Sequence, residues 1–254
     1  MCCFSRPVQS VSATKIFARS AEGGRQYLVY SMTLRAKEAL AMVLPLPVKP
    51  GSGEKAVKFI ELSAYSEFFD DLLKGFPIPV AVDSLSPPPT DSLPATRAKL
   101  EVVAVGSFES SFVPTVGDFS RLDERFRLPP GTWDKLPAYR SHGFAVFKLK
   151  SGEAKVHPMA FSFPRANPTE LFFPTVNIHD SKVHAKAHFD HLLYCQRGPG
   201  DLFTLLDWDE SFRPAAAFMN LGKSKDLLDG NEHCYKRTFA GSLPNKDFVL
   251  QSAA

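Results

Sequence analysis

Apolar and polar side chains alternate with a period of two over much of the chain, and this pattern predicts β-strands. Two such runs, residues 14–19 (TKIFAR) and 25–34 (RQYLVYSMTL), flank the segment AEGG. That spacing predicts a β-hairpin closed by a glycine-containing loop. Residues 142–150 (HGFAVFKLK) and 155–163 (KVHPMAFSF) alternate in the same way around SGE. They predict a second hairpin, so we expect antiparallel pairing to dominate the fold.

Two further predicted strands contain proline. Residues 40–48 (LAMVLPLPV) form an apolar run that is interrupted by Pro45 and Pro47. Because proline cannot donate to a strand ladder, we expect this strand to end near Leu44 or to lie at a sheet edge. Residues 170–178 (ELFFPTVNI) predict another strand, and the proline inside it indicates an edge or a bulge.

One segment has the spacing of a helix. Residues 54–74 (EKAVKFIELSAYSEFFDDLLK) carry apolar side chains at steps of three and four positions, at Val57, Ile60, Ala64, Phe68 and Leu72. Gly75 follows as a stop signal for this helix. Shorter helical turns are expected at residues 118–126 and 130–136.

Together these elements predict an α+β fold that is β-rich, with mostly antiparallel hairpins and a few short helices packed on the sheet. The chain has 254 residues, and we expect a single domain over residues 1–254. Residues 84–96 (SLSPPPTDSLPAT) are rich in proline and serine, so they predict an exposed loop that separates two lobes. The 22 phenylalanines and 21 prolines, against 15 glycines, fit short strands joined by rigid turns.

Metal-capable side chains concentrate in residues 177–195 (NIHDSKVHAKAHFDHLLYC), which hold four of the seven histidines and one of the four cysteines. As a helix, this stretch would place His184, His188, His191 and Cys195 on one face. As a strand, it would point His191 and Cys195 inward and the other two histidines to the polar side. We favour the strand, because the neighbouring segments also predict strands. Two interpretations stay open: a metal site completed from elsewhere in the fold, or a core histidine at 191 beside solvent-facing histidines.

The N-terminal stretch MCCFSRPV is the second concentration of candidate chemistry. Removal of Met1 would leave Cys2 with an α-amine and a thiol on one residue. That pair can chelate a metal ion or act as nucleophile and base together. Cys3 adds a second thiol, and a frayed end without function is the alternative.

The net charge of +3 is weak, and this bears on which partners the protein can bind. No basic cluster accompanies this weak charge, which argues against nucleic-acid binding. No run of about 18 apolar residues predicts a membrane span, and the N-terminus lacks the pattern of a signal peptide. We therefore expect a cytoplasmic protein without a membrane partner, in which the four cysteines are thiols or ligands rather than disulfides.

Thiolates and imidazoles together suit copper or zinc. The leading hypothesis is a cytoplasmic metal-binding protein, and a metalloenzyme if the ion keeps an open coordination position. Its substrate would be an unidentified small molecule or peptide, and the sequence predicts no oligomeric state. The expected metal ligands are Cys2, Cys3, His179, His184, His191 and Cys195.

The order of short motifs resembles an uncharacterised bacterial family of unknown function. The resemblance implies β-rich pairing, and no activity is known for that family. It also extends to the later segments GFAVFKLK and PTELFFP. The residues that carry it are Cys2-Cys3-Phe4, Pro7-Val8, Ile16-Phe17-Ala18 and residues 41–47 (AMVLPLP).

The first twenty residues also resemble cysteine N-terminal nucleophile hydrolases of the bile-salt-hydrolase and penicillin-acylase type. Those enzymes begin Met-Cys and carry an arginine after a Phe-containing strand, as Cys2 and Phe17-Ala18-Arg19 do here. The Asp that follows the arginine in that family is absent. The resemblance implies Cys2 as nucleophile and Arg19 as the group that stabilises charge on an amide substrate. This hydrolase and a non-catalytic structural or binding module stand as alternatives to the metal-binding hypothesis.

Overall fold

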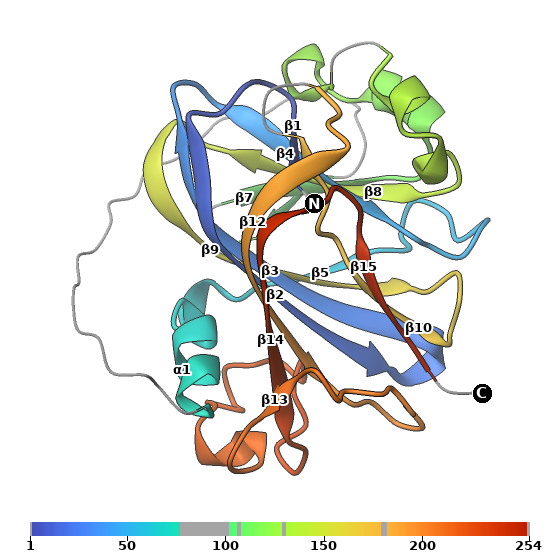
Figure 1. The fold of residues 1–254 in the computed structure, drawn as a ribbon. Helices are drawn as coiled ribbons and strands as arrows, with labels where there is room; N and C mark the ends of the chain where they lie inside the picture. Colours follow the sequence, from blue (N-terminus) through green and yellow to red (C-terminus); the bar gives the residue numbers. More distant parts are fainter. Residues whose placement is uncertain (1, 77–101, 106–107, 129–130, 179–181, 253–254) are drawn as a thin grey trace.

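Two large β-sheets form the centre of the computed structural model, which describes residues 2–76, 102–105, 108–128, 131–178 and 182–252 (Figure 1). The first has six strands in the order β11-β1-β4-β8-β7-β6. The second has seven in the order β13-β14-β12-β2-β3-β9-β5, and β10 pairs with β15 separately. Within the described residues, no helix is long and apolar enough to cross a membrane. The predicted loop at 84–96 lies outside them.

The strands of the six-stranded sheet are β1 (Cys2–Phe4), β4 (Leu40–Leu46), β6 (Val102–Val105), β7 (Phe108–Val113), β8 (Gly143–Leu149) and β11 (Asn177–Ile178). Those of the seven-stranded sheet are β2 (Ser10–Ala21), β3 (Arg25–Ala36), β5 (Lys58–Ile60), β9 (Gly152–Pro164), β12 (Lys186–Gln196), β13 (Asp209–Glu210) and β14 (Cys234–Pro244). The separate pair is β10 (Glu170–Phe173) and β15 (Phe248–Gln251). The helices are α1 (Phe68–Lys74) and the 3₁₀ turns η1 (Glu22–Gly24), η2 (Ser63–Tyr65), η3 (Val116–Arg121), η4 (Glu124–Phe126), η5 (Trp133–Lys135), η6 (Pro137–Tyr139) and η7 (Ala215–Ala217).

The β-rich α+β fold and the first hairpin are confirmed, because β2 and β3 pair antiparallel around η1. The prediction of antiparallel pairing is only partly right. β12 runs parallel to β2, and β1 runs parallel to β11. The second predicted hairpin is wrong: β8 pairs with β4 and β7, whereas β9 pairs with β3 and β5 in the other sheet. The short turn between β8 and β9 therefore crosses from one sheet to the other.

The core between the two sheets follows from the period of two. Alternate residues of β4 and β8, such as Met42 and Phe147, meet alternate residues of β3 and β9, such as Tyr30 and Phe161, in one buried cluster. The Phe147 and Phe161 rings, one from each sheet, have centroids 5.8 Å apart. The sheets are therefore joined mainly by aromatic and aliphatic packing, with backbone hydrogen bonds where the chain after β4 meets the end of β9, such as Ala166 N–H to the Pro47 carbonyl at 2.8 Å.

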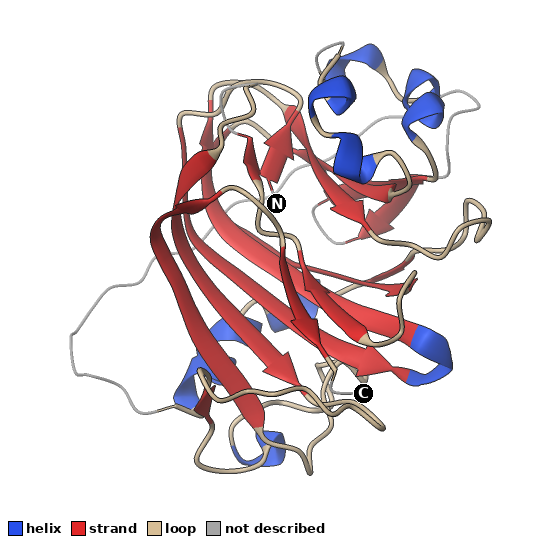
Figure 2. Ribbon diagram, turned by 45° about the vertical axis from the view of Figure 1, so that its right-hand side comes forward, coloured by secondary structure: helices blue, strands red, loops and turns tan. Residues whose placement is uncertain are grey.

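The intervening residues of the same strands point outward into two further clusters, each with its own cover (Figure 2). On the six-stranded sheet, Phe144 of β8 packs with Phe119 and Trp133 of η3 and η5. On the seven-stranded sheet, Phe17 of β2 packs against Phe68 of α1. β4 and β8 are thus covered on both faces, which explains their nearly continuous burial.

Two local predictions need correction. The helix expected over residues 54–74 begins only at Phe68, and its N-terminal part forms β5 and η2 instead. Pairing of β5 with β9 overrides the local helical spacing there. The strand with Pro45 is not an edge strand. It passes through Pro45 inside the sheet, because β1 pairs only at Val43 and Met42 and needs no N–H from position 45.

Removal of the Phe161 ring tests the core between the sheets. We expect Phe161→Ala to lower the free energy of unfolding by about 3–5 kcal/mol, because the buried ring leaves a cavity between the two sheets. The same substitution at exposed Phe212 should change it by less than about 0.5 kcal/mol. Urea unfolding of both variants measures the difference, and equal losses would contradict the proposed core.

Candidate functional site

The histidine-rich stretch is a strand, as the sequence favoured. Along β12 the side chains alternate, so that His188 is exposed while His191 and Cys195 are buried. His184 precedes the strand and is exposed, and His179 lies outside the described residues. The interpretation of His191 as a buried histidine beside solvent-facing ones is confirmed, but among the described residues the hydrogen bond expected for its ring is not formed.

The prediction of a copper or zinc site is wrong. Nowhere in the described ranges do three or more His, Cys, Asp or Glu side chains come close enough together to hold a metal ion. The reason is topological. Cys3 lies in the cluster outside the six-stranded sheet, whereas Cys195 lies in the core between the sheets. His191 instead packs its ring against Phe189, with the Asp190 carboxylate 3.4 Å from its Nδ1.

The hydrolase arrangement does not assemble either. Cys2 pairs with Asn177, and the Asn177 side-chain amide donates to the carbonyl of His188 at one end of β12. Arg19 pairs with Gln196 at the other end of the same strand. Eight residues of extended strand separate these two points, a span of about 26 Å. Arg19 therefore lies too far from Cys2 to stabilise charge on a substrate held there.

Arg19 instead belongs to a polar row across the end of the seven-stranded sheet. Gln196 is in register with Arg19, Arg19 with Tyr27, and Tyr27 with Ser162, so four neighbouring strands contribute one residue each. Each of the four lies two positions along its strand from a residue of the outer apolar cluster, as Arg19 does from Phe17, and so shares its face of the sheet. The row therefore faces the outer side of this sheet, beyond the end of the apolar cluster.

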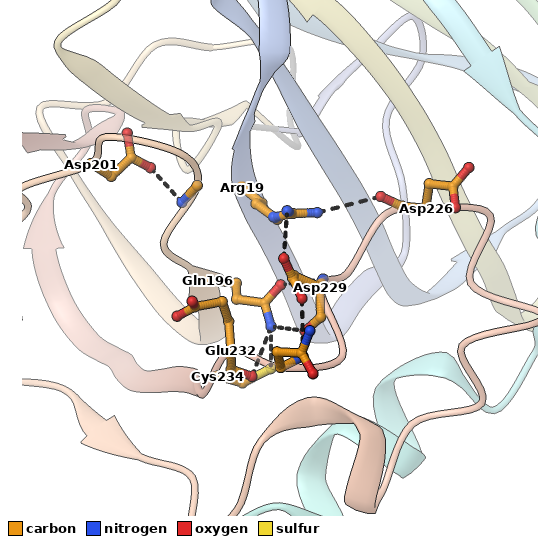
Figure 3. A network of polar contacts seen from close by, with 9 residues as sticks. Arg19, Gln196, Asp201, Asp226, Asp229, Glu232 and Cys234 are labelled. Carbon is orange, nitrogen blue, oxygen red and sulfur yellow. Dashed lines mark hydrogen bonds and ion pairs between the residues drawn. The ribbon is translucent and has the colours of Figure 1, made fainter.

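Gln196 fixes the loop that covers this row. Its side chain is fully buried, and its Nε2 donates to the carbonyls of Asp229 (2.8 Å) and Glu232 (3.1 Å). Its Oε1 accepts from the Asp229 backbone N–H at 2.8 Å. Figure 3 shows this amide beneath the loop, close to Cys234. One buried side chain thus satisfies several backbone groups that water would otherwise need to reach.

The Arg19 guanidinium is held loosely by comparison. Its Nη1 donates to the Asp226 carbonyl at 3.4 Å, and its Nη2 lies 3.7 Å from the Asp229 carboxylate (Figure 3). Its Nε is buried without a hydrogen-bond partner. Only 13% of the side chain is exposed. A mostly buried guanidinium with long contacts retains donors that can bind an anion.

The loop beside Arg19 has strained backbone. Lys225 and Asp226 both have left-handed conformations, with φ of 53° and 61°. For a residue such as lysine this conformation costs about 1–2 kcal/mol. The Asp226 carbonyl in this loop accepts from Arg19, while Figure 3 shows the Asp226 carboxylate turned away from the guanidinium. Strained residues of this kind cluster at functional sites.

A cavity of about 330 Å³ lies over this polar row. Its volume is at the lower end of the range of about 300–1,000 Å³ for ligand sites. Arg25 on its wall donates through Nε and Nη2 to the Ala56 carbonyl and to both oxygens of Ser162, at 2.8–3.3 Å. Arg19, with its longer contacts and its unpartnered Nε, is the more weakly held of the two guanidinium groups on the wall. The cavity is lined by Arg19, Ala21, Glu22, Arg25, Tyr27, Ser162, Pro199, Asp226 and Asp229.

Sequence reasoning singled out Arg19 for another role and missed the rest of this site. A usable signal was present: Arg19 and Gln196 are polar residues that directly follow the apolar runs IFA and LLYC. The loop residues Asp226 and Asp229 gave no such signal. They reach Arg19 only because the segment after β12 folds back over the end of the sheet.

The connection between β12 and β14, residues 197–233, carries a second unusual feature. Leu202, Leu206 and Phe212 are 63%, 91% and 73% exposed. Each follows a buried neighbour or precedes one, as Leu206 follows Leu205 and Phe212 follows Ser211. The backbone of this connection is fixed by hydrogen bonds, including Phe212 N–H to the Gly75 carbonyl at 3.0 Å. Large apolar side chains are therefore displayed on an ordered support.

Comparisons with known proteins give a likeness of fold. No family model matches the chain. Baculovirus P35 is 12% identical with a TM-score of 0.49, over 96% of this chain and 97% of that one. A mutated baculovirus P35 solved after caspase cleavage is 11% identical with a TM-score of 0.49, over 95% and 100%. P35 in a complex with caspase-8 is 12% identical with a TM-score of 0.47, over 95% and 96%. The resemblance to an uncharacterised bacterial family stays a prediction.

The buried thiols provide a test of the corrected site. Burial raises the pKa of Cys234 to about 12 and raises the pKa of Cys195 well above its ordinary value. Both are protonated at neutral pH, so they are poor nucleophiles and poor metal ligands. We expect alkylation of either thiol to be at least about 100-fold slower in the native protein than after denaturation. Peptide mass mapping measures this, and rapid native labelling of Cys195 would contradict the structure.

Three histidines make stability depend on pH. Burial lowers the pKa of His142, His157 and His191 below the ordinary value of about 6.5. The unfolded chain therefore binds protons that the folded chain does not, and stability falls as the pH drops below about 6.5. We expect a slope of up to about 1.4 kcal/mol per pH unit for each histidine. Urea unfolding between pH 7.5 and pH 5 measures the dependence of the free energy of unfolding on pH. The variant His142→Phe should remove the contribution of one histidine to this slope.

Proposed function

We propose that this protein acts by binding another protein, with the connection 197–233 as its contact surface. The single observation that carries the proposal is the exposure of Leu206 and Phe212 on that connection. Burial of a leucine or phenylalanine side chain is worth about 1.5–3 kcal/mol, and aromatic residues are frequent energetic centres of interfaces. The partner is therefore expected to offer an apolar depression. The proposal keeps the cytoplasmic location expected from the sequence.

The ordered backbone of the connection adds support. The Trp208 and Phe203 side chains between and beside the exposed residues are buried. Ser211 donates its backbone N–H to the Cys234 carbonyl at 2.8 Å, and Ala215 donates to the Glu232 carbonyl at 2.9 Å. A surface that is ordered before binding loses little conformational entropy when a partner docks. An exposed apolar side chain on such a support is suited to recognition.

The test compares two variants of this connection. We expect the double variant Leu206→Ser, Phe212→Ser to weaken partner binding at least about ten-fold, because two apolar side chains lose their burial. The matched control is Lys223→Ser, which removes an exposed polar side chain from the same connection and should leave affinity unchanged. Caspase-8, the protein with which P35 is solved in a complex, is the first probe. Biolayer interferometry measures the affinity for caspase-8. The intact mass of the chain after incubation with caspase-8 shows whether the chain is cleaved.

Each outcome is informative. If the double variant binds caspase-8 as tightly as the wild type does, the contact surface lies elsewhere and the proposal is contradicted. If caspase-8 gives no complex, sedimentation of the protein alone tests a second copy as the partner, with the same variants. A monomer under these conditions, together with no caspase-8 complex, would also overturn the proposal.

A further inference from the structure

We propose that the cavity at Arg19 binds a carboxylate, supplied by an Asp or Glu side chain of the bound partner. This inference rests on the proposed function for the source of the carboxylate, but the site itself can be tested on the isolated protein. It starts from the state of the guanidinium. Arg19 has five N–H donors, of which Nε has no partner and two others make contacts of 3.4 and 3.7 Å.

The geometry favours a planar anion. Guanidinium and carboxylate groups match in a two-bond fork, which uses two parallel donors of Arg19 at once. The Asp229 carboxylate, at 3.7 Å from Nη2, does not make this fork. It also accepts the Asn231 backbone N–H at 2.9 Å through Oδ1, which gives it a partner of its own. An incoming carboxylate can therefore replace a weak contact without leaving Asp229 unsatisfied.

The surrounding charges select a single negative charge over a double one. Glu22, Asp226 and Asp229 line the cavity with Arg19 and Arg25, so a dianionic phosphate would meet three carboxyl groups against two guanidinium groups. The one nearest to Arg19 is Asp229, because the Asp226 side chain is turned away (Figure 3). A monoanionic carboxylate balances Arg19 with less repulsion. The Tyr27 ring and Pro199 offer apolar wall to the carbon atoms of the entering side chain.

The cavity wall and the proposed contact surface belong to the same segment. Pro199, Asp226 and Asp229 are part of the connection 197–233, and so are the exposed apolar residues. Leu221, which is 38% exposed, packs so closely over Gly230 that a Cβ there would lie 2.5 Å from its Cδ1. Gly230 directly follows Asp229. A partner that covers Leu221 would therefore also cover the chain next to Asp229, at the wall of the cavity.

The experiment titrates the whole, ¹⁵N-labelled protein with a blocked aspartate (N-acetyl, N-methylamide) and follows the backbone amide signals of Ala21 and Asp229. Blocked asparagine has the same shape without the charge. Acetate separates recognition of a bare carboxylate from recognition of an amino-acid side chain. We expect blocked aspartate to shift these signals and blocked asparagine to leave them in place, because only the carboxylate pairs with Arg19.

Three variants give the decisive comparison. Arg19→Lys keeps the charge but loses the fork, and we expect it to weaken binding at least about ten-fold. Asp229→Asn removes the competing carboxylate, and we expect binding to tighten at least about two-fold. Lys15→Gln is the matched control, because it removes a cation of the same strand. Lys15 pairs with Asp70 rather than with the cavity, so this variant should leave binding unchanged.

A purely structural Arg19–Asp229 pair predicts a different pattern. It gives no shift with blocked aspartate in the wild type or in Asp229→Asn, and that result would overturn the inference. Equal shifts with blocked asparagine, or unchanged binding in Arg19→Lys, would overturn it as well. Binding of blocked aspartate without any protein complex would retain the carboxylate site and reject only the proposed function. A protein complex without carboxylate binding would retain the proposed function and reject only the carboxylate site.

Discussion

The packing of the two sheets against each other is the interaction on which the other features of this protein depend. Strands of both sheets contribute alternate residues to one buried core, where Phe147 of one sheet meets Phe161 of the other. No strand pairing joins β8 to β9 across this interface. Side-chain volume, together with the backbone hydrogen bonds between residues 47–49 and 164–166, sets the relative position of the sheets. An interior packed at crystal-like density holds that position firmly.

This core also determines where polar chemistry can lie. Because the inner faces of both sheets are filled by apolar side chains, the polar row of Gln196, Arg19, Tyr27 and Ser162 lies on an outer face at a strand end. The connection 197–233 then covers that end and is fixed there by the buried amide of Gln196. The candidate cavity is the space left between a rigid sheet end and this fixed cover.

The sequence predicted the period-two elements well and their partners poorly. The alternation in β12 placed His191 and Cys195 inward and His188 outward, as the structure has them. The second half of the same strand is buried on both sides, since Tyr194 packs under Phe69 and Phe76. No local pattern reveals that cover. The expected metal site failed for a related reason: ligand density along a chain says nothing about which side of a sheet each ligand occupies.

The same limit applies to the candidate site. Arg19 could be recognised from sequence as a polar residue that ends an apolar run, but its neighbours come from segments far along the chain. The positive φ of Lys225 belongs to a turn that the Leu227 N–H closes on the Ser224 carbonyl at 3.1 Å, and lysine itself has no preference that would reveal this turn. The prediction for residues 54–74 went wrong in the same way, when strand pairing overrode helical spacing.

The parallel pairing of β2 with β12 has a consequence for biosynthesis. Ala13 donates to Asp190, 177 residues further along the chain, so one side of β2 has no partner until most of the protein has left the ribosome. Contacts of such long range close slowly, because a large loop must be ordered first. During that interval an unpaired strand edge is open to other chains. A nascent chain of this fold therefore depends on protection of β2 until translation nears its end.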